Sequence, residues 1–103
     1  MIEFISMTHD EAIRRLKEHE AELRELGVER LYLFGSTASD TAGPDSDVDL
    51  FFDYPKGKLG LFGLMEVKER AAAILGRHVD IMTRDSIHRV LRPRIEQSAV
   101  LVF

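Results

Sequence analysis

Two aspartates separated by one residue, Asp47 and Asp49, open the strand-like run DVDLFFDY. Successive side chains of a strand point to opposite faces, so both carboxylates share a face with Phe51 and Asp53, and the apolar residues between them point the other way. Two carboxylates on one face repel each other, whereas Mg²⁺ takes carboxylate oxygens together with phosphate oxygens as ligands. The pair therefore predicts a divalent-cation site that recruits a nucleotide.

A third carboxylate, Asp80, lies in the run HVDIMT between Val79 and Ile81. The alternation puts Asp80 on the face opposite its two apolar neighbours. If this strand lies beside the first acidic strand, the three carboxylates converge. Such a set suits two-metal phosphoryl-type transfer, in which cations about 3.5–4 Å apart stabilise the attacking and the leaving oxygen.

Gly35 and Ser36 end the apolar run VERLYLF, and ten residues separate Ser36 from Asp47. A glycine lets the backbone approach a phosphate closely, and a serine hydroxyl with neighbouring N–H groups binds phosphate oxygens. A Gly-Ser pair alone is a weak signal. Its spacing from the two aspartates, with a further strand aspartate downstream, makes the combination specific.

Gly35, Ser36, ten intervening residues, Asp47 and Asp49 resemble the Gly-Ser-x10-Asp-x-Asp motif of the DNA polymerase beta-like nucleotidyltransferase superfamily. The length is similar to that of its minimal nucleotidyltransferase (MNT) branch. The resemblance implies transfer of a nucleoside monophosphate, AMP from ATP, to a hydroxyl. It also implies that Asp47 and Asp49 bind two Mg²⁺ ions and that Asp80, the third carboxylate, helps to activate the acceptor hydroxyl. Gly35 and Ser36 would hold the triphosphate.

Many MNT proteins are antitoxins that act beside a helical HEPN ribonuclease toxin, which some of them adenylylate. The resemblance therefore implies a HEPN-type toxin as partner, in a hetero-oligomer, and protein adenylyltransferase activity. The family often continues Gly-Ser-x-Ala-Arg-Gly, but Ser39 and Asp40 stand here in place of Arg-Gly. A lost guanidinium and an added carboxylate weaken triphosphate binding. The alternative is an antitoxin that neutralises its toxin by binding alone.

The other acids of this stretch have plainer interpretations. DSDVD could be a solvated acidic turn, with Asp45 as a turn former, and Asp53 a strand-end surface acid. A calcium loop starting at Asp45 is excluded, because Leu50 stands where that loop needs Gly and Lys56 where it needs Glu.

The histidines have no metal-ligand spacing, and the basic residues near the C-terminus have two interpretations. Four histidines are scattered along the chain and are interpreted as surface residues: His9, His19, His78 and His88. A basic set near the C-terminus could contact a triphosphate or an acidic partner, or form an ordinary solvated helical face: Arg84, His88, Arg89, Arg92 and Arg94.

The elements that position these residues follow from periodicity and caps. A capping box at Thr8 and Glu11 begins a helix that apolar spacing extends to Gly27, and Gly76 closes a second helix over 59–75. Strands are expected over 28–34, 47–54 and 78–83, and a short third helix near Pro93. The final AVLVF is either an edge strand or a contact surface.

This order predicts an α+β (α/β) fold, a small mixed β-sheet with helices packed on one face. The resemblance implies the same fold, that of the polymerase beta-like nucleotidyltransferases. At 103 residues the chain is expected to form one domain, 1–103, without room for a substrate-binding domain, so small-molecule and RNA nucleotidyltransferases are disfavoured.

Composition bounds the remaining classes. The chain has no cysteine, which excludes disulfides, thiolate metal sites and cysteine nucleophiles. A formal net charge of −4 argues against direct nucleic-acid binding. No apolar run approaches the roughly 20 residues of a membrane helix, so we expect a cytoplasmic protein without membrane contact.

Overall fold

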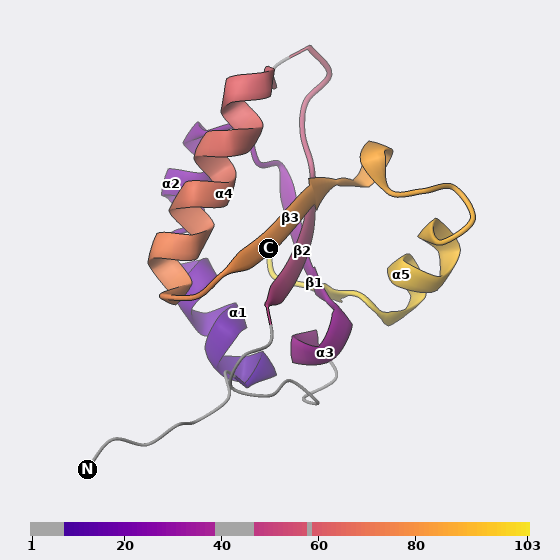
Figure 1. The fold of residues 1–103 in the computed structure, drawn as a ribbon. Helices are drawn as coiled ribbons and strands as arrows, with labels where there is room; N and C mark the ends of the chain where they lie inside the picture. The colour runs from indigo at the N-terminus through magenta and orange to yellow at the C-terminus, as the bar shows by residue number, and fades with distance from the viewer. Residues whose placement is uncertain (1–7, 39–46, 58) are drawn as a thin grey trace.

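The computed structural model describes residues 8–38, 47–57 and 59–103 of the chain (Figure 1). Two helices precede the first strand, and helices and strands are interspersed after it. In chain order they are α1 (His9–Glu18), α2 (Glu20–Glu25), β1 (Arg30–Phe34), α3 (Gly35–Ala38), β2 (Val48–Asp53), α4 (Leu61–Leu75), β3 (Val79–Thr83), the 3₁₀ turn η1 (Arg84–Ser86), α5 (Arg92–Ser98) and β4 (Val100–Leu101). No helix of the described ranges is long and apolar enough to cross a membrane.

The strands form one mixed sheet in the order β3-β2-β1-β4. β1 pairs antiparallel with β2 and with β4, whereas β2 and β3 run parallel. The parallel pair is connected through α4, because a parallel connection needs a crossover of a dozen or more residues. The predicted mixed sheet and α+β class are confirmed, and AVLVF contributes the edge strand β4.

The core lies between the sheet and α1, α2 and α4, which cover one of its faces (Figure 1). The two faces alternate along each strand, so the buried strand residues toward these helices occupy every second position: Leu31, Leu33, Val48, Leu50, Phe52, Val79 and Ile81. Leu16, Leu23, Val67 and Ala71 meet them from the helices. Burying a side chain of this size contributes roughly 1.5–3 kcal/mol, so this one layer supplies most of the hydrophobic stabilisation.

The first helix is not continuous as predicted. α1 ends at Glu18 and α2 begins at Glu20, because His19 leaves helical geometry with φ −111° and ψ 20° and its N–H bonds back to the Leu16 carbonyl at 3.1 Å. Leu16 and Leu23 nevertheless both reach the core. The apolar spacing that predicted one helix is therefore preserved across the break.

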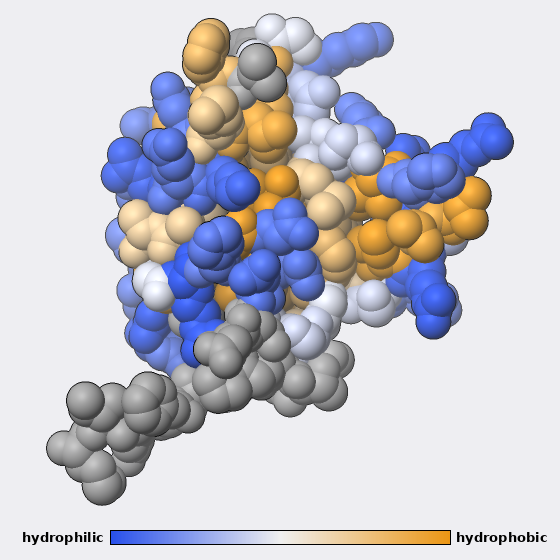
Figure 2. All heavy atoms as spheres, in the orientation of Figure 1, coloured by the Kyte–Doolittle hydropathy of each residue, from blue (hydrophilic) through white to orange (hydrophobic). Residues whose placement is uncertain are grey.

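The segment after β3 forms a lobe away from α1, α2 and α4 (Figure 1). Pro93 stands in the first turn of α5, where its missing N–H costs nothing, so the predicted helix begins at Arg92 and not before it. Val90 and Leu91, just ahead of α5, are exposed. Figure 2 shows apolar side chains gathered on this lobe, and hydrophilic ones over the middle of the same view.

Candidate active site

The backbone between β1 and α3 approaches the acidic strand closely. Phe34, the last residue of β1, is the register partner of Asp49, so Gly35 comes next to that carboxylate. Gly35 has φ +76°, and a Cβ built on it would overlap Asp49 Oδ2 and lie 3.1 Å from Asp49 Cγ. Only glycine combines this backbone conformation with this proximity. The Gly-Ser pair and Asp49 are therefore adjacent in the fold.

Asp49 and Asp80 lie side by side on neighbouring parallel strands, as register partners of β2 and β3. The pKa of Asp49 is raised, first by burial and then by the negative charges of Asp80 and Asp47. Among the described residues, neither Asp49 nor Asp80 forms an ion pair with a cationic side chain. The carboxylates therefore create a local negative field that a bound cation would relieve.

Asp47 lies just ahead of β2 and is more open to solvent, with 56% of its side chain exposed. Its Oδ1 is 4.0 Å from Nδ1 of His78, and the His78 carbonyl accepts a hydrogen bond from the Val48 N–H at 3.1 Å. His78 is 84% exposed, as expected of a surface histidine. Its proximity to Asp47 was not expected, because it depends on β3 pairing with β2.

The three predicted ligands are not assembled as a closed cage. Within residues 8–38, 47–57 and 59–103, no group of three or more His, Asp or Glu side chains is arranged to hold a metal ion. Asp49 and Asp80 are paired by register, and Asp47 stands at the rim. Mg²⁺ is usually held by one or two carboxylates with substrate phosphates and water, so the donor set present fits this ion.

The short helix α3 carries Ser36 directly after Gly35 and is fixed from two sides. Contacts to β1 and β2 hold it against the sheet, and Nδ1 of His9 lies 2.9 Å from the Ala38 carbonyl. His9, interpreted from the sequence as a surface residue, therefore helps to hold the helix on which Ser36 lies. No local sequence signal could have shown this, because the contact joins α1 to α3. Ser39, Asp40 and Asp45 lie outside the described residues.

Asp53 is bound within the fold and separate from the acids at the other end of β2. Arg84 donates to both of its carboxylate oxygens, at 2.7 and 3.1 Å, and to Glu96 of α5 at 2.9 Å. The guanidinium also lies over the rings of Tyr32 and Phe51, and its pKa is raised, first of all by the hydrogen bond to Asp53. The expected strand-end acid is thus half of a structural ion pair.

Phe51 shares the face of Asp49, yet it is fully buried. Tyr32 stacks on it with ring centroids 4.8 Å apart, and Arg84 covers it from the side of β3. An apolar block therefore fills the middle of this face and leaves the acids at one end.

Of the basic set, Arg92 also serves the fold by donating to the Asp85 and Ile87 carbonyls, whereas Arg89 and Arg94 are exposed.

The family model for the nucleotidyltransferase domain matches residues 16–102 of the chain. The chain belongs to the nucleotidyltransferase family. It is similar to the protein adenylyltransferase MntA of Thermococcus cleftensis, with 32% identity over 97 residues, which cover 93% of this chain and 97% of that protein. The resemblance to the minimal nucleotidyltransferases is confirmed.

Solved structures agree with this nucleotidyltransferase assignment. One described as a candidate minimal nucleotidyltransferase superposes with a TM-score of 0.78 at 27% identity, covering 91% of this chain and 95% of that one. Another contains the tri-AMPylated HEPN toxin of Shewanella oneidensis in complex with an MNT antitoxin. It matches with a TM-score of 0.63 at 19% identity, covering 88% of this chain and 71% of that one, and so shows a shared fold.

Proposed function

We propose that this nucleotidyltransferase transfers AMP from ATP to a hydroxyl of a protein partner, a HEPN-type helical toxin, and acts as its antitoxin in the cytoplasm. The observation that carries the proposal is the pairing of Asp49 with Asp80, directly beside Gly35. Asp49, which is partly buried, and Asp80, which is exposed, lie beside a glycine whose missing side chain lets the backbone approach a phosphate closely. The named protein adenylyltransferase similar over nearly the whole chain supports the substrate class.

Each site residue then has a defined role in the transfer of AMP. Gly35 and Ser36 bind the β- and γ-phosphates, while Asp47, Asp49 and Asp80 hold Mg²⁺, which when bound neutralises charge on the phosphates and the leaving oxygen. The acceptor oxygen forms a bond to the α-phosphorus as the bond to the bridging oxygen of pyrophosphate breaks. Asp80 accepts the hydroxyl proton. Pyrophosphate leaves on the side of Gly35 and Ser36.

The test combines the chain with a co-purified HEPN-type partner, ATP and Mg²⁺, and measures the intact mass of both proteins. We expect the partner to gain AMP, and the double variant Asp47→Asn/Asp49→Asn to transfer none while it still forms the complex. A matched control is Asp53→Asn, which removes a carboxylate from the same strand outside the site. Equal transfer by the double variant and by wild type would contradict the assignment of the aspartates.

A second function, neutralisation by binding alone, is favoured by one observation of the chain itself. Ser39 and Asp40 stand where the family motif that the chain resembles often continues with Arg-Gly after the Gly-Ser pair. Without the guanidinium a triphosphate is bound less tightly. No AMP on the partner, together with complex formation that the double variant leaves intact, would select this function. Introducing Ser39→Arg/Asp40→Gly would then be expected to raise ATP affinity.

A further inference from the structure

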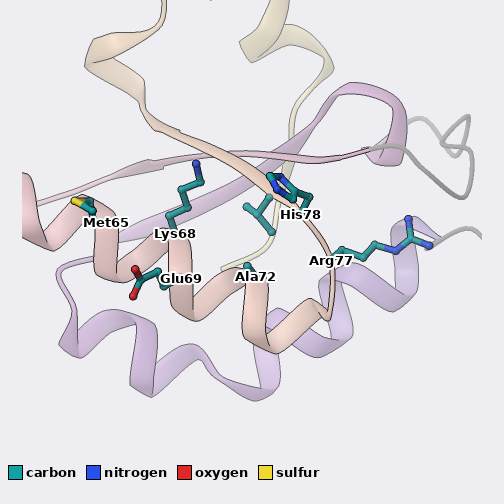
Figure 3. Close-up of a pocket in the computed structure, with 7 residues that line it drawn as sticks. Met65, Lys68, Glu69, Ala72, Arg77 and His78 are labelled. Carbon is teal, nitrogen blue, oxygen red and sulfur yellow. The ribbon is translucent and has the colours of Figure 1, made fainter.

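A groove of about 410 Å³ runs along the outer edge of β3, between that strand and α4. Its apolar lining comes from Met65, Ala72 and Val79, and Lys68 and His78 bring positive or titratable nitrogen atoms to it. Figure 3 shows the side chains of Lys68 and His78 pointing to the same side, over β3. The volume lies in the range of roughly 300–1,000 Å³ that binding clefts occupy.

The groove is continuous with the candidate active site through His78. This residue lines the groove and lies 4.0 Å from Asp47, and Asp80 follows it two positions later on β3. Among the described strands β3 pairs with β2 alone, so its other edge faces the groove. Asp80 points to the sheet face opposite Val79, so a ligand in the groove would reach the acids around that outer edge of β3, without crossing β2 or β1.

The stereochemistry of phosphoryl transfer decides what such a ligand is. The attacking and leaving oxygens stand roughly in line on opposite sides of the phosphorus. Across the sheet the order is Gly35 and Ser36 after β1, Asp49 on β2, Asp80 on β3 and then the groove. With pyrophosphate leaving toward Ser36, the acceptor must approach from the side of β3.

We propose that this groove is the acceptor site: it binds an extended segment of the protein partner that carries the hydroxyl to be modified. This inference rests on the proposed function and adds the place and chemistry of its second substrate. The apolar lining calls for an apolar side chain in the segment. Lys68 and His78 border the groove together with one acidic residue, Glu69, while the Arg77 side chain points away from them (Figure 3). Two basic groups against one carboxylate favour acidic neighbours around the hydroxyl.

Two variants test the site, each with a matched control. Lys68→Glu reverses a charge at the groove, and Lys17→Glu makes the same change at an exposed position of α1. Ala72→Phe fills the groove, and Ala73→Phe adds the same ring to the neighbouring exposed position of α4. Melting temperatures within the spread of the controls show that each variant folds.

The probe is a displayed library of random peptides with a central serine, threonine or tyrosine, selected on the protein with Mg²⁺ and AMP-PNP. Wild type should enrich peptides with an apolar residue and acidic neighbours. Lys68→Glu and Ala72→Phe should weaken binding of those peptides about tenfold or more, the value of one charge-assisted contact, while the controls retain it. Calorimetric affinity for Mg·ATP should be unchanged in all four variants.

Three outcomes would overturn the inference. The first is that wild type enriches no peptides, and the second is that the groove variants enrich the same peptides as wild type. The third is that Ala72→Phe loses Mg·ATP affinity as strongly as it loses peptide binding, which would make the groove a nucleoside site. Failure of the proposed function would give a different result, because wild type would then select peptides but transfer no AMP to the HEPN-type partner.

Discussion

Gly35→Ala is expected to disable the site through a single methyl group. Gly35 has φ +76°, a conformation that costs an L-residue about 1–2 kcal/mol. The new Cβ would also overlap Asp49 Oδ2 and lie 3.1 Å from Asp49 Cγ. That separation is at least about 0.4 Å shorter than ordinary carbon–carbon contact, so the carboxylate must move away.

Gly57→Ala provides the matched control. Gly57 has φ +80°, and nothing lies within 4 Å of the Cβ that alanine would add. The control should therefore lose only the conformational term, about 1–2 kcal/mol of unfolding free energy, and keep its nucleotide affinity. Gly35→Ala should lose at least as much stability, and also AMP transfer by about 100-fold, the effect expected of a reacting group displaced by about 1 Å.

Chemical denaturation and the intact-mass assay for transferred AMP measure both quantities. The double variant Gly35→Ala/Asp49→Ala removes the carboxylate that the new methyl group would overlap, so its unfolding free energy should be higher than the sum of the two single changes predicts. Additive changes, or a Gly35→Ala protein that matches Gly57→Ala in stability and transfer, would refute the close approach of Gly35 to Asp49 as the cause.

Three further predictions concern the acids and their partners. The pKa of Asp49 is raised in the folded state, so the contribution of this group to stability is present at low pH and is lost as pH rises through that pKa. Asp49→Asn should therefore raise the melting temperature of the metal-free protein at neutral pH. Below about pH 4 it should leave the melting temperature unchanged. Arg84→Met should lower the unfolding free energy by about 1–3 kcal/mol in urea titrations, because Asp53 loses both of its hydrogen bonds; an equal loss in the Asp53→Asn background would contradict this pairing. Mg²⁺ with AMP-PNP should raise the melting temperature of wild type and of Asp53→Asn, but not that of Asp47→Asn/Asp49→Asn, by differential scanning fluorimetry; a rise in the double variant would place the ligand elsewhere.

The sequence was sufficient wherever a local rule determined the structure. Strand alternation placed Asp49 and Asp80 on faces that the register of β2 and β3 brings together, and Gly76 ends α4 in the left-handed conformation. These features follow from periods of two and from a single cap. The faces and the cap follow without any knowledge of strand order. Only the convergence of Asp49 and Asp80 needs the further assumption that β3 lies beside β2.

The rest depended on contacts between distant segments. Parity placed Phe51 on the acidic face, but its burial comes from Tyr32 on another strand and Arg84 beyond β3. The break at His19 leaves the apolar spacing intact on both sides, so periodicity could not reveal it. The position of His78 beside Asp47 likewise requires the sheet order, which a single sequence does not state.

The two ends of β2 show how this fold treats carboxylates in opposite ways. At one end Asp53 receives a guanidinium that donates two hydrogen bonds to it. At the other, Asp49 is partly buried beside Asp80, and within the described residues no cationic side chain pairs with either of them. The same strand thus shows that this fold can provide an arginine partner for a carboxylate. Leaving Asp49 beside Asp80 without an arginine partner costs stability in the metal-free protein, a cost that a bound cation would offset. Stability and ligand binding are therefore coupled at this site, so a variant that stabilises the metal-free protein by removing the repulsion should lose nucleotide binding to a corresponding degree.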